Sequence, residues 1–371
     1  MTNNNPFSSL SDPAGRREHS PGFSVFFFSG EASEQASENI YSLVMRAAKF
    51  ADDNGFEAIW VPERHFHSFG GLFPSPAIIA SAIAATTKRL HIRAGSVVLP
   101  MHNPVNVVEE WSVIDNISNG RVGLSVAPGF HPSDFLLKPE NYLQRRDIFR
   151  QNIQDIMTLW RGDTFIAPDG LGRDTRVLTL PRPLQKALPL WLTASESEES
   201  FRRAGAAGAN VLTSLLALDR KTLAARISAW RQSFIPGAMN NAGRITLMLH
   251  TFVSPDESEV HKYGVEALKR YLKEHLSFAA PRADYDKITC LSDSDKDALV
   301  EYATRRYTRD ASLIGTPEHC KKIIEELVET GVDEIACLID FGVPEEQALH
   351  SLEEIAKLKE YFSARKLARS A

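Results

Sequence analysis

The chain has 371 residues, of which 43% are hydrophobic and 24% are charged. This composition is typical of a water-soluble globular protein with enough apolar residues for a large core. The formal net charge of -5 at pH 7 gives no electrostatic reason to expect nucleic acid or an anionic membrane as a partner. No apolar run approaches the roughly 20 residues that a membrane-spanning helix needs. The length fits one (β/α)8 barrel with insertions.

The N-terminal segment and the cysteines indicate where such a protein works. Residues 1–22 are polar and contain no apolar core of a signal peptide, so we expect a disordered lead-in. The three cysteines are odd in number and show no CxxC spacing, and Cys337 lies inside an apolar run, as a buried structural thiol does. These features favour a reducing cytoplasm over a secreted, disulfide-linked fold.

Eight short apolar segments alternate with helical patterns along the chain. We expect strands at residues 23–28, 58–61, 92–99, 122–127, 190–194, 209–213, 244–253 and 334–339. Helical patterns include those at about residues 37–54, 75–86, 103–119, 143–160 and 316–331. No GxGxxG opens a helix after any strand, and no period of 20–50 residues repeats. The alternation therefore predicts a single (β/α)8 TIM barrel over residues 23–366.

Two segments interrupt this alternation. Residues 162–184 include the turn signal Asp169-Gly170 and are typical of an insertion that holds a hairpin. Residues 282–311 are charged and have little periodicity, so we expect a mobile excursion over one end of the barrel.

The segment from residue 91 to residue 130 carries the most specific local signals. Asn103 is a suitable cap for the helix that follows it, and Asn119-Gly120 is suited to end that helix. Small residues occupy the third strand at Gly95-Ser96 and the end of the fourth strand at Ala127 and Gly129. Ligand sites of parallel α/β proteins lie at the carboxyl ends of strands, where large side chains would crowd a ligand. We therefore predict a ligand site at these residues.

The loop after the second strand contains an HxH sequence, His65-Phe66-His67. Together with Asp340 at the end of the eighth strand, it is similar to the ligand set of metal-dependent hydrolase barrels. Those hydrolases also need histidines after strands five and six, where this chain has Ala194-Ser195 and Thr213-Ser214. We therefore expect no metal, and the hydrolase stays a remote alternative.

Two other interpretations of this loop stay open. In the first, Glu63 pairs with Arg64 and the histidines have structural roles. In the second, which we favour, a histidine lies at the mouth of a cofactor or substrate site, where a pKa near neutrality suits proton transfer.

The loop after the fifth strand is rich in serine. Ser195, Ser197 and Ser200 surround a helix start, whose free amides and dipole favour an anion such as phosphate. The alternative is a capping box formed by Ser195 and Glu198. Because barrels often hold phosphate after strands seven and eight, Gly315-Thr316 is a competing phosphate site.

With these residues placed, the chain resembles the bacterial luciferase-like family of flavin monooxygenases. It most resembles the subgroup associated with natural-product assembly lines. The resemblance covers nearly everything from Phe23 to about Leu352. The matching segments are PERHFHSFGGLFPSP, RAGSVVLPMHNPVNVVEEWSVIDNISNGRVGLS, GFHPSDFLLKPENYLQRR, LPLWLTASESEESFRRAGAAGANVLT, RITLMLHTFV and GVDEIACLIDFGV.

The resemblance implies that FMN binds at the carboxyl ends of the barrel strands, is reduced by a separate flavin reductase, and reacts with O2 as co-substrate. It implies a non-proline cis peptide bond at Gly95-Ser96, beneath the flavin ring. The cofactor-binding residues that it implies are Gly95, Ser96, Ala127, Pro128, Gly129, Tyr142, Ala194, Ser195, Glu196, Ser197 and Ser200. Luciferases carry two adjacent histidines after strand two, the first of them implicated in catalysis. Arg64 replaces that first histidine and His65 remains, so these two are the catalytic candidates.

These observations favour an FMN-dependent monooxygenase that hydroxylates a carbon or nitrogen of a secondary-metabolite intermediate, either free or tethered to a carrier protein. FMN is favoured over FAD because no adenine-binding motif appears. We expect a cytoplasmic homodimer without nucleic-acid or membrane partners. The alternatives are a deazaflavin-dependent oxidoreductase of the same fold and a non-catalytic flavin-binding partner.

Overall fold

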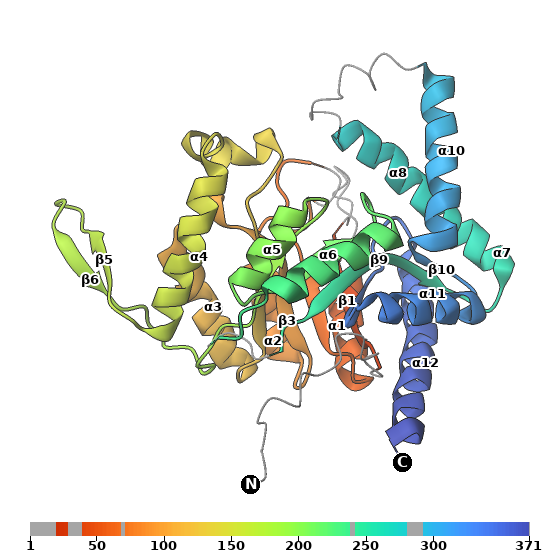
Figure 1. Ribbon diagram of the computed structural model, residues 1–371, viewed down its shortest axis with the longest axis horizontal. Coiled ribbons are helices and arrows are strands. Elements are labelled where there is room, and N and C mark those ends of the chain that lie inside the picture. The colour runs from red at the N-terminus through yellow and green to blue at the C-terminus, as the bar shows by residue number, and fades with distance from the viewer. Residues whose placement is uncertain (1–19, 29–38, 68–70, 238–241, 280–291, 371) are drawn as a thin grey trace, which may run out of the picture.

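The computed structural model describes residues 20–28, 39–67, 71–237, 242–279 and 292–370. Its main sheet has nine strands in the order β10-β9-β11-β1-β2-β3-β4-β7-β8, and a β8–β9 pairing closes eight of them into a barrel. All neighbouring strands of the barrel are parallel, and helices surround it (Figure 1). The predicted (β/α)8 barrel is confirmed.

All eight predicted strands are present in the barrel. They are β1 (Gly22–Phe26), β2 (Ala58–Val61), β3 (His91–Val98), β4 (Val122–Ala127), β7 (Leu190–Thr193), β8 (Asn210–Ser214), β9 (Ile245–Val253) and β11 (Glu334–Leu338). Almost every residue in them is buried, as expected for parallel strands covered on both faces. The ninth strand, β10 (Leu313–Gly315), was not predicted. It has only three residues and pairs with the last residues of β9.

The helices largely follow their predicted bounds. They are α1 (Ser42–Asp53), α2 (Pro76–Thr86), α3 (Pro104–Ser118), α4 (Arg145–Arg161), α5 (Glu198–Ala206), α6 (Arg220–Ser233), α7 (Glu257–Glu259), α8 (Glu266–Ala279), α10 (Asp293–Asp310), α11 (Pro317–Thr330) and α12 (Glu345–Ser370). The Asn103 side chain accepts a hydrogen bond from the Val105 amide and caps α3 as predicted. Asn119 and Gly331 adopt left-handed conformations where α3 and α11 end. No described helix is long and apolar enough to cross a membrane.

Shorter helical segments lie between these elements. They are the 3-10 turns η1 (Leu99–Met101), η2 (Pro132–Leu137) and η3 (Pro139–Asn141), and the π-helix η4 (Val260–Val265). Helix α1 begins at Ser42, five residues later than expected, and residues 39–41 before it form a turn; the predicted start at residue 37 lies outside the described residues. Most of the expected lead-in, residues 1–19, also lies outside them.

The first predicted insertion does hold a hairpin. Strands β5 (Phe165–Pro168) and β6 (Asp174–Val177) pair antiparallel and extend away from the barrel (Figure 1).

The expected excursion at residues 282–311 is a regular helix, not an aperiodic segment, in the part that the structure describes. Residues 293–310 form helix α10, which begins at Ser292, whose hydroxyl accepts a hydrogen bond from the Asp295 amide. Helix α10 lies beside α8 (Figure 1), and ion pairs such as Lys269–Glu301 join the two helices. Only a narrow stripe of α10 is buried, at Val300, Thr304 and Tyr307. The charged composition conceals this stripe in the sequence. Residues 282–291 lie outside the described residues.

Two of the three cysteines are described, and both are buried free thiols. Burial raises the pKa of Cys337 to about 12, so this thiol stays protonated at neutral pH. The expectation of a structural thiol is therefore confirmed for Cys337, and Cys290 lies outside the described residues.

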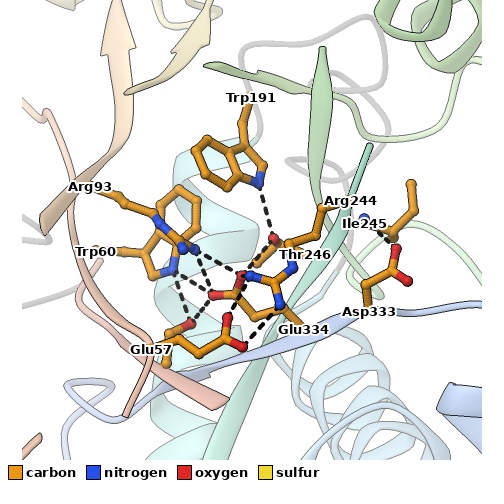
Figure 2. Close-up of polar contacts among 10 residues, drawn as sticks. Glu57, Trp60, Arg93, Trp191, Arg244, Ile245, Thr246, Asp333 and Glu334 are labelled. Carbon is orange, nitrogen blue, oxygen red and sulfur yellow. Dashed lines mark hydrogen bonds and ion pairs between the residues drawn. The ribbon is translucent and has the colours of Figure 1, made fainter. Parts of the chain in front are cut away.

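A buried carboxylate occupies the barrel interior near the amino ends of its strands. Glu334, the first residue of β11, is fully buried, and Arg93 Nη1 lies 2.8 Å from both of its oxygens. Ser24 donates to Oε1 at 2.6 Å, and Arg244 lies 3.4 Å from Oε2. In Figure 2 the two arginines converge on Glu334. Burial alone would raise the pKa of Glu334, but the two guanidinium groups hold it below its usual value.

Aromatic rings complete the surroundings of this ion pair. The guanidinium carbon of Arg93 lies 4.9 Å from the centroid of Trp60 and 4.5 Å from that of Trp191. The Trp191 indole donates to Thr246, whose hydroxyl in turn donates to Glu334 at 3.2 Å. The side chains come from β1, β2, β3, β7, β9 and β11, so the network joins six of the eight barrel strands.

We predict that Glu334→Gln lowers the free energy of unfolding by about 3 kcal/mol, because it leaves the buried guanidinium group of Arg93 without its counter-charge, whereas Arg244 keeps its ion pair with Glu57. Denaturant unfolding followed by circular dichroism measures the change. Glu301→Gln, which removes the partner of the exposed Lys269, is the control and is expected to cause a much smaller loss. Equal losses in the two variants would contradict a central role for Glu334.

Candidate functional site

Three hydroxyl groups meet where β3, β4 and β7 approach their carboxyl ends. Ser96 Oγ lies 2.9 Å from Ser125 Oγ and 2.5 Å from Thr193 Oγ1, and the last two atoms are 2.9 Å apart. The Gly95-Ser96 peptide bond is cis, as the resemblance implies. Thr193 is exposed although it belongs to a central barrel strand. Polar hydroxyls are therefore accessible at the end of the barrel where the ligand site was predicted.

The end of β4 is shaped by Gly129. This residue has a φ of +71°, and a Cβ atom built on it would lie 2.7 Å from Val98 Cγ1 and 2.8 Å from Phe135 Cε2. Both the backbone conformation and the close packing therefore require glycine. Arg145 donates to the Gly129 carbonyl at 3.3 Å, and its guanidinium carbon lies 4.4 Å from the centroid of Tyr142. Through Arg145 the structure brings Tyr142 close to the end of β4.

The serine-rich loop after β7 does not form the capping box that was one of its two interpretations. Helix α5 has Ser197, not Ser195, at its N-cap position, and no side chain caps it. Glu198 is bonded to Arg202 and to Arg226 of α6. Ser195, Glu196 and Ser197 are exposed and Ser200 is half-buried, so the start of α5 faces solvent with uncapped amides.

The competing phosphate site at Gly315-Thr316 is already engaged within the protein. The Thr316 side chain accepts a hydrogen bond from the His319 amide and caps α11. A Cβ atom built on Gly315 would lie 2.6 Å from the His319 ring. The structure therefore favours the loop after β7 over this alternative.

The loop after β2 is held by one buried carboxylate. Glu63 accepts hydrogen bonds from the Val98 amide at 2.8 Å and lies 3.0 Å from His65 Nε2 and 2.6 Å from His102 Nε2. Its bonds thus come from two histidines and a backbone amide, and the interpretation that it pairs with Arg64 gains no support. Glu63 connects the catalytic candidate His65 to β3, two residues beyond Ser96.

The electrostatics of this cluster follow from the contacts of Glu63. Burial alone would raise the pKa of Glu63, but the hydrogen bonds to His102 and His65 outweigh it and lower that pKa. Burial alone would lower the pKa of His102, but the bond to Glu63 and the negative charge of that carboxylate raise it. At neutral pH the Glu63 carboxylate is therefore ionised.

Arg64, the other catalytic candidate, lies among aromatic rings. Its guanidinium carbon is 4.9 Å from the centroid of Phe28 and 5.8 Å from that of Phe130. Burial lowers the pKa of Arg64, and the charge of Asp134 partly offsets this effect. A buried guanidinium group bordered by Phe28 and Phe130 suits the binding of a planar or anionic group.

His65, His67 and Asp340, the set that would be similar to a hydrolase metal site, have other partners. Both carboxylate oxygens of Asp340 accept hydrogen bonds from the Phe28 amide, at 2.9 and 3.1 Å. His65 is directed at Glu63 instead. Among the described residues, His67 comes close to a different pair of potential ligands, His131 and Asp134.

Sequence reasoning missed several residues of this region. Ser125 and Thr193 are hydroxyl residues within or at the end of apolar strands, a signal that was available in the sequence. His102 and Arg226 gave no such signal, because their partners Glu63 and Glu198 lie 39 and 28 residues away in the chain.

Comparison with known protein families gives one match, which covers most of the chain. The family described as luciferase-like monooxygenase matches residues 22–334. The chain is 24% identical over 336 residues to the oxygenase component of the flavin-dependent trigonelline monooxygenase of Acinetobacter baylyi, covering 90% of this chain and 93% of that protein. It is also 24% identical to the 4-hydroxyprotoasukamycin monooxygenase of Streptomyces nodosus subsp. asukaensis, over 77% and 76% of the two chains.

Solved structures share the fold. The monooxygenase RslO1 from Streptomyces bottropensis has a TM-score of 0.74 and 21% identity, over 91% of this chain and 98% of that chain. The oxygenating constituent of 3,6-diketocamphane monooxygenase from Pseudomonas putida, in complex with FMN, has a TM-score of 0.73 and 17% identity, over 92% and 98%.

We predict that the stabilising effect of His102 decreases as the pH rises. A folded-state pKa above the usual value of about 6.5 means that the contribution is complete below that value and is lost as the pH passes the raised pKa. The difference in the free energy of unfolding between the wild type and His102→Gln should therefore be larger at about pH 5.5 than at about pH 9. Urea unfolding at both pH values measures it.

The control for this prediction is the same comparison in a Glu63→Gln background. Without the carboxylate, the cause of the raised pKa of His102 is gone, and the effect of His102→Gln should no longer fall with rising pH. A pH-independent effect in the wild-type background would show that the Glu63–His102 contact is not an ion pair.

Proposed function

Because the chain belongs to the luciferase-like monooxygenase family, we propose that it is a flavin-dependent monooxygenase that binds FMN at the carboxyl ends of its barrel strands. The proposed reaction uses O2 and reduced FMN to hydroxylate a carbon or nitrogen of a secondary-metabolite intermediate, free or bound to a carrier protein. Similarity to a 4-hydroxyprotoasukamycin monooxygenase supports this substrate class. Similarity to a protein named as an oxygenase component supports a separate reductase as the source of reduced FMN.

The observation that carries the FMN assignment is the uncapped start of α5. The first four amides of a helix lack acceptors within the regular helix; in α5 the Ser200 amide donates to the Ser197 carbonyl at 3.1 Å, and no N-cap side chain accepts from the others. A phosphate group would accept hydrogen bonds from these amides and from the exposed serine hydroxyls. Glu196 and Glu198 oppose a dianion, but Arg202 and Arg226 bond to Glu198 and reduce its effect. The loop fits the phosphate of FMN.

The strand ends next to this loop fit a flat ring. Gly95, Ser96 and Ala127 are small, Gly129 cannot carry a side chain without displacing Val98, and the hydroxyl of Thr193 is accessible. Bound reduced FMN would supply two electrons, so that one oxygen atom of O2 enters the substrate and the other leaves as water. This chain's own contribution is to orient the ring and substrate and to exclude water from the site.

Arg64 and His65 are the proposed groups that act near the substrate. Glu63 fixes the ring of His65 through the 3.0 Å contact with Nε2, so that the other ring nitrogen, Nδ1, is the one left to exchange a proton with bound groups. Arg64, which lies close to two aromatic rings, would bind a planar or negatively charged part of the substrate. The buried position of both residues suits chemistry from which water is excluded.

Ligand titrations test the choice of cofactor. We expect FMN to bind more tightly than FAD or a deazaflavin when each is added in reduced form without oxygen. With a flavin reductase present to supply reduced FMN, we expect the protein to divert oxygen consumption into hydroxylated product once its substrate is supplied. Tighter binding of FAD would contradict the FMN proposal. Tighter binding of a deazaflavin would favour hydride-transfer chemistry on the same fold.

We predict that replacing both Ser197 and Ser200 by alanine weakens FMN binding at least about tenfold. Each hydroxyl is proposed to donate a charge-assisted hydrogen bond to phosphate, worth roughly 1.5–3 kcal/mol, and about 1.4 kcal/mol corresponds to one factor of ten. Fluorescence titration measures the affinity.

Riboflavin and Ser195→Ala provide the controls. Riboflavin has no phosphate, so the double variant and the wild type should bind it equally. Ser195→Ala should leave the melting temperature unchanged, because Ser195 does not cap α5. Unchanged FMN affinity in a folded double variant would remove this loop from the site and favour Gly315-Thr316.

A further inference from the structure

Two histidines and an aspartate meet above the barrel, in a grouping that the sequence did not suggest. His67 follows β2, His131 follows β4, and Asp134 lies in η2. Their potential ligand atoms all lie within 4.8 Å of one another. His131 and Asp134 are buried and His67 is half-buried.

The two imidazole rings turn toward a common point. Nε2 of His67 lies 3.2 Å from the hydroxyl oxygen of Ser133, and Nδ1 of His131 lies 2.6 Å from the same atom. The ring centroids are 4.6 Å apart and the rings are nearly perpendicular. A hydroxyl carries one proton and can donate to only one of the two nitrogens. The other nitrogen can donate its own proton to the same oxygen, so both rings are directed at one hydroxyl group.

Asp134 adds a carboxylate oxygen that lacks a hydrogen bond. Its side chain is 7% exposed, and Oδ1 is buried without a hydrogen-bond partner in the described part of the chain. An unsatisfied buried carboxylate oxygen is costly, and in native proteins it commonly has a functional cause such as an ion. One carboxylate oxygen of Asp134 lies within 4.8 Å of a ring nitrogen of each histidine.

We propose that His67, His131 and Asp134 form a binding site for a divalent transition-metal ion, with Zn²⁺ as the best match. Two imidazole nitrogens and one carboxylate oxygen form a typical ligand set for Zn²⁺ and its first-row neighbours, and leave positions open for water. This set differs from His65, His67 and Asp340, which the structure separates.

The spacing requires only small movements to bind the ion. Three atoms that lie within 4.8 Å of one another fit inside a circle whose radius is about 2.8 Å. Bonds from zinc to nitrogen or oxygen are about 2.0–2.2 Å long, so each ligand atom moves by less than about 1 Å. When the ion binds, the ring nitrogens of His67 and His131 turn from the Ser133 hydroxyl to the ion. The hydroxyl then lies next to the ligands without sharing a hydrogen bond with both rings.

The charges around the site are mixed. A metal ion binds the neutral form of each imidazole, so the ion and a proton compete for the two rings. The guanidinium group of Arg64 opposes a cation, and the carboxylates of Asp134 and Glu63 offset it. Occupancy would join the loop after β2 to η2, and these segments flank Arg64 and Phe130.

Metal titration of the whole protein, freed of metal with a chelator and without flavin, tests this inference. We expect one Zn²⁺ per chain by calorimetry and one Co²⁺ by its visible absorption. His67→Ala, His131→Ala and Asp134→Asn should each weaken Zn²⁺ binding at least about tenfold. His350→Ala, which removes an exposed histidine of α12, is the matched control and should bind like the wild type.

A thermal readout covers variants that fold poorly. Zn²⁺ should raise the melting temperature of the wild type and of His350→Ala but not that of Asp134→Asn, whose side chain keeps its shape. Absence of saturable binding near one ion per chain, or unchanged affinity in Asp134→Asn and His131→Ala, would overturn the proposal. Because flavin is absent, neither result depends on the FMN assignment, which the riboflavin comparison tests separately.

Discussion

The buried charge of Glu334 is the constraint on which the barrel depends. A carboxylate without water is tolerated only when cations and hydrogen-bond donors surround it, and Arg93, Arg244, Ser24 and Thr246 do so. Ser24, Arg93 and Thr246 belong to β1, β3 and β9, and Glu334 belongs to β11, so the interaction joins four strands that are remote in sequence inside the barrel. Because this network stabilises the amino ends of the strands, their carboxyl ends can carry small and polar residues, which add little to the packing of the core.

A second buried carboxylate organises the opposite end of the barrel. Glu63 joins the loop after β2 to the backbone of β3 at Val98 and holds the side chains of His65 and His102. The two carboxylates differ in their partners, since Glu334 lies beside permanently charged guanidinium groups and Glu63 is bonded to imidazole rings, of which His102 has a raised pKa. The charge on the partners of Glu334 therefore stays constant across the neutral range, whereas the charge on His102 changes with pH.

The sequence predicted the features that depend on local residues. The buried strands were recognisable from runs such as residues 122–127, and the ends of α3 from Asn103 and Asn119, because burial on both faces and helix caps leave short-range patterns. The cis peptide at Gly95-Ser96 was expected only through family resemblance. Helix α10 was missed because its buried stripe is narrow and its composition charged. The partners of Glu63 and the His67–His131–Asp134 grouping were missed because they arise from contacts between distant segments.

The hydroxyls of Ser96, Ser125 and Thr193 form a closed cycle, and this has a directional consequence. Ser96 donates its only hydroxyl proton to Ser125. The other two bonds then run from Ser125 to Thr193 and from Thr193 to Ser96, so all three hydroxyl protons are engaged within the cycle. Each oxygen then keeps one lone pair for an outside group and no proton. A ligand N–H is accepted without any rearrangement, whereas a ligand carbonyl must first open one bond of the cycle, at about 1 kcal/mol. This part of the barrel mouth therefore selects for hydrogen-bond donors.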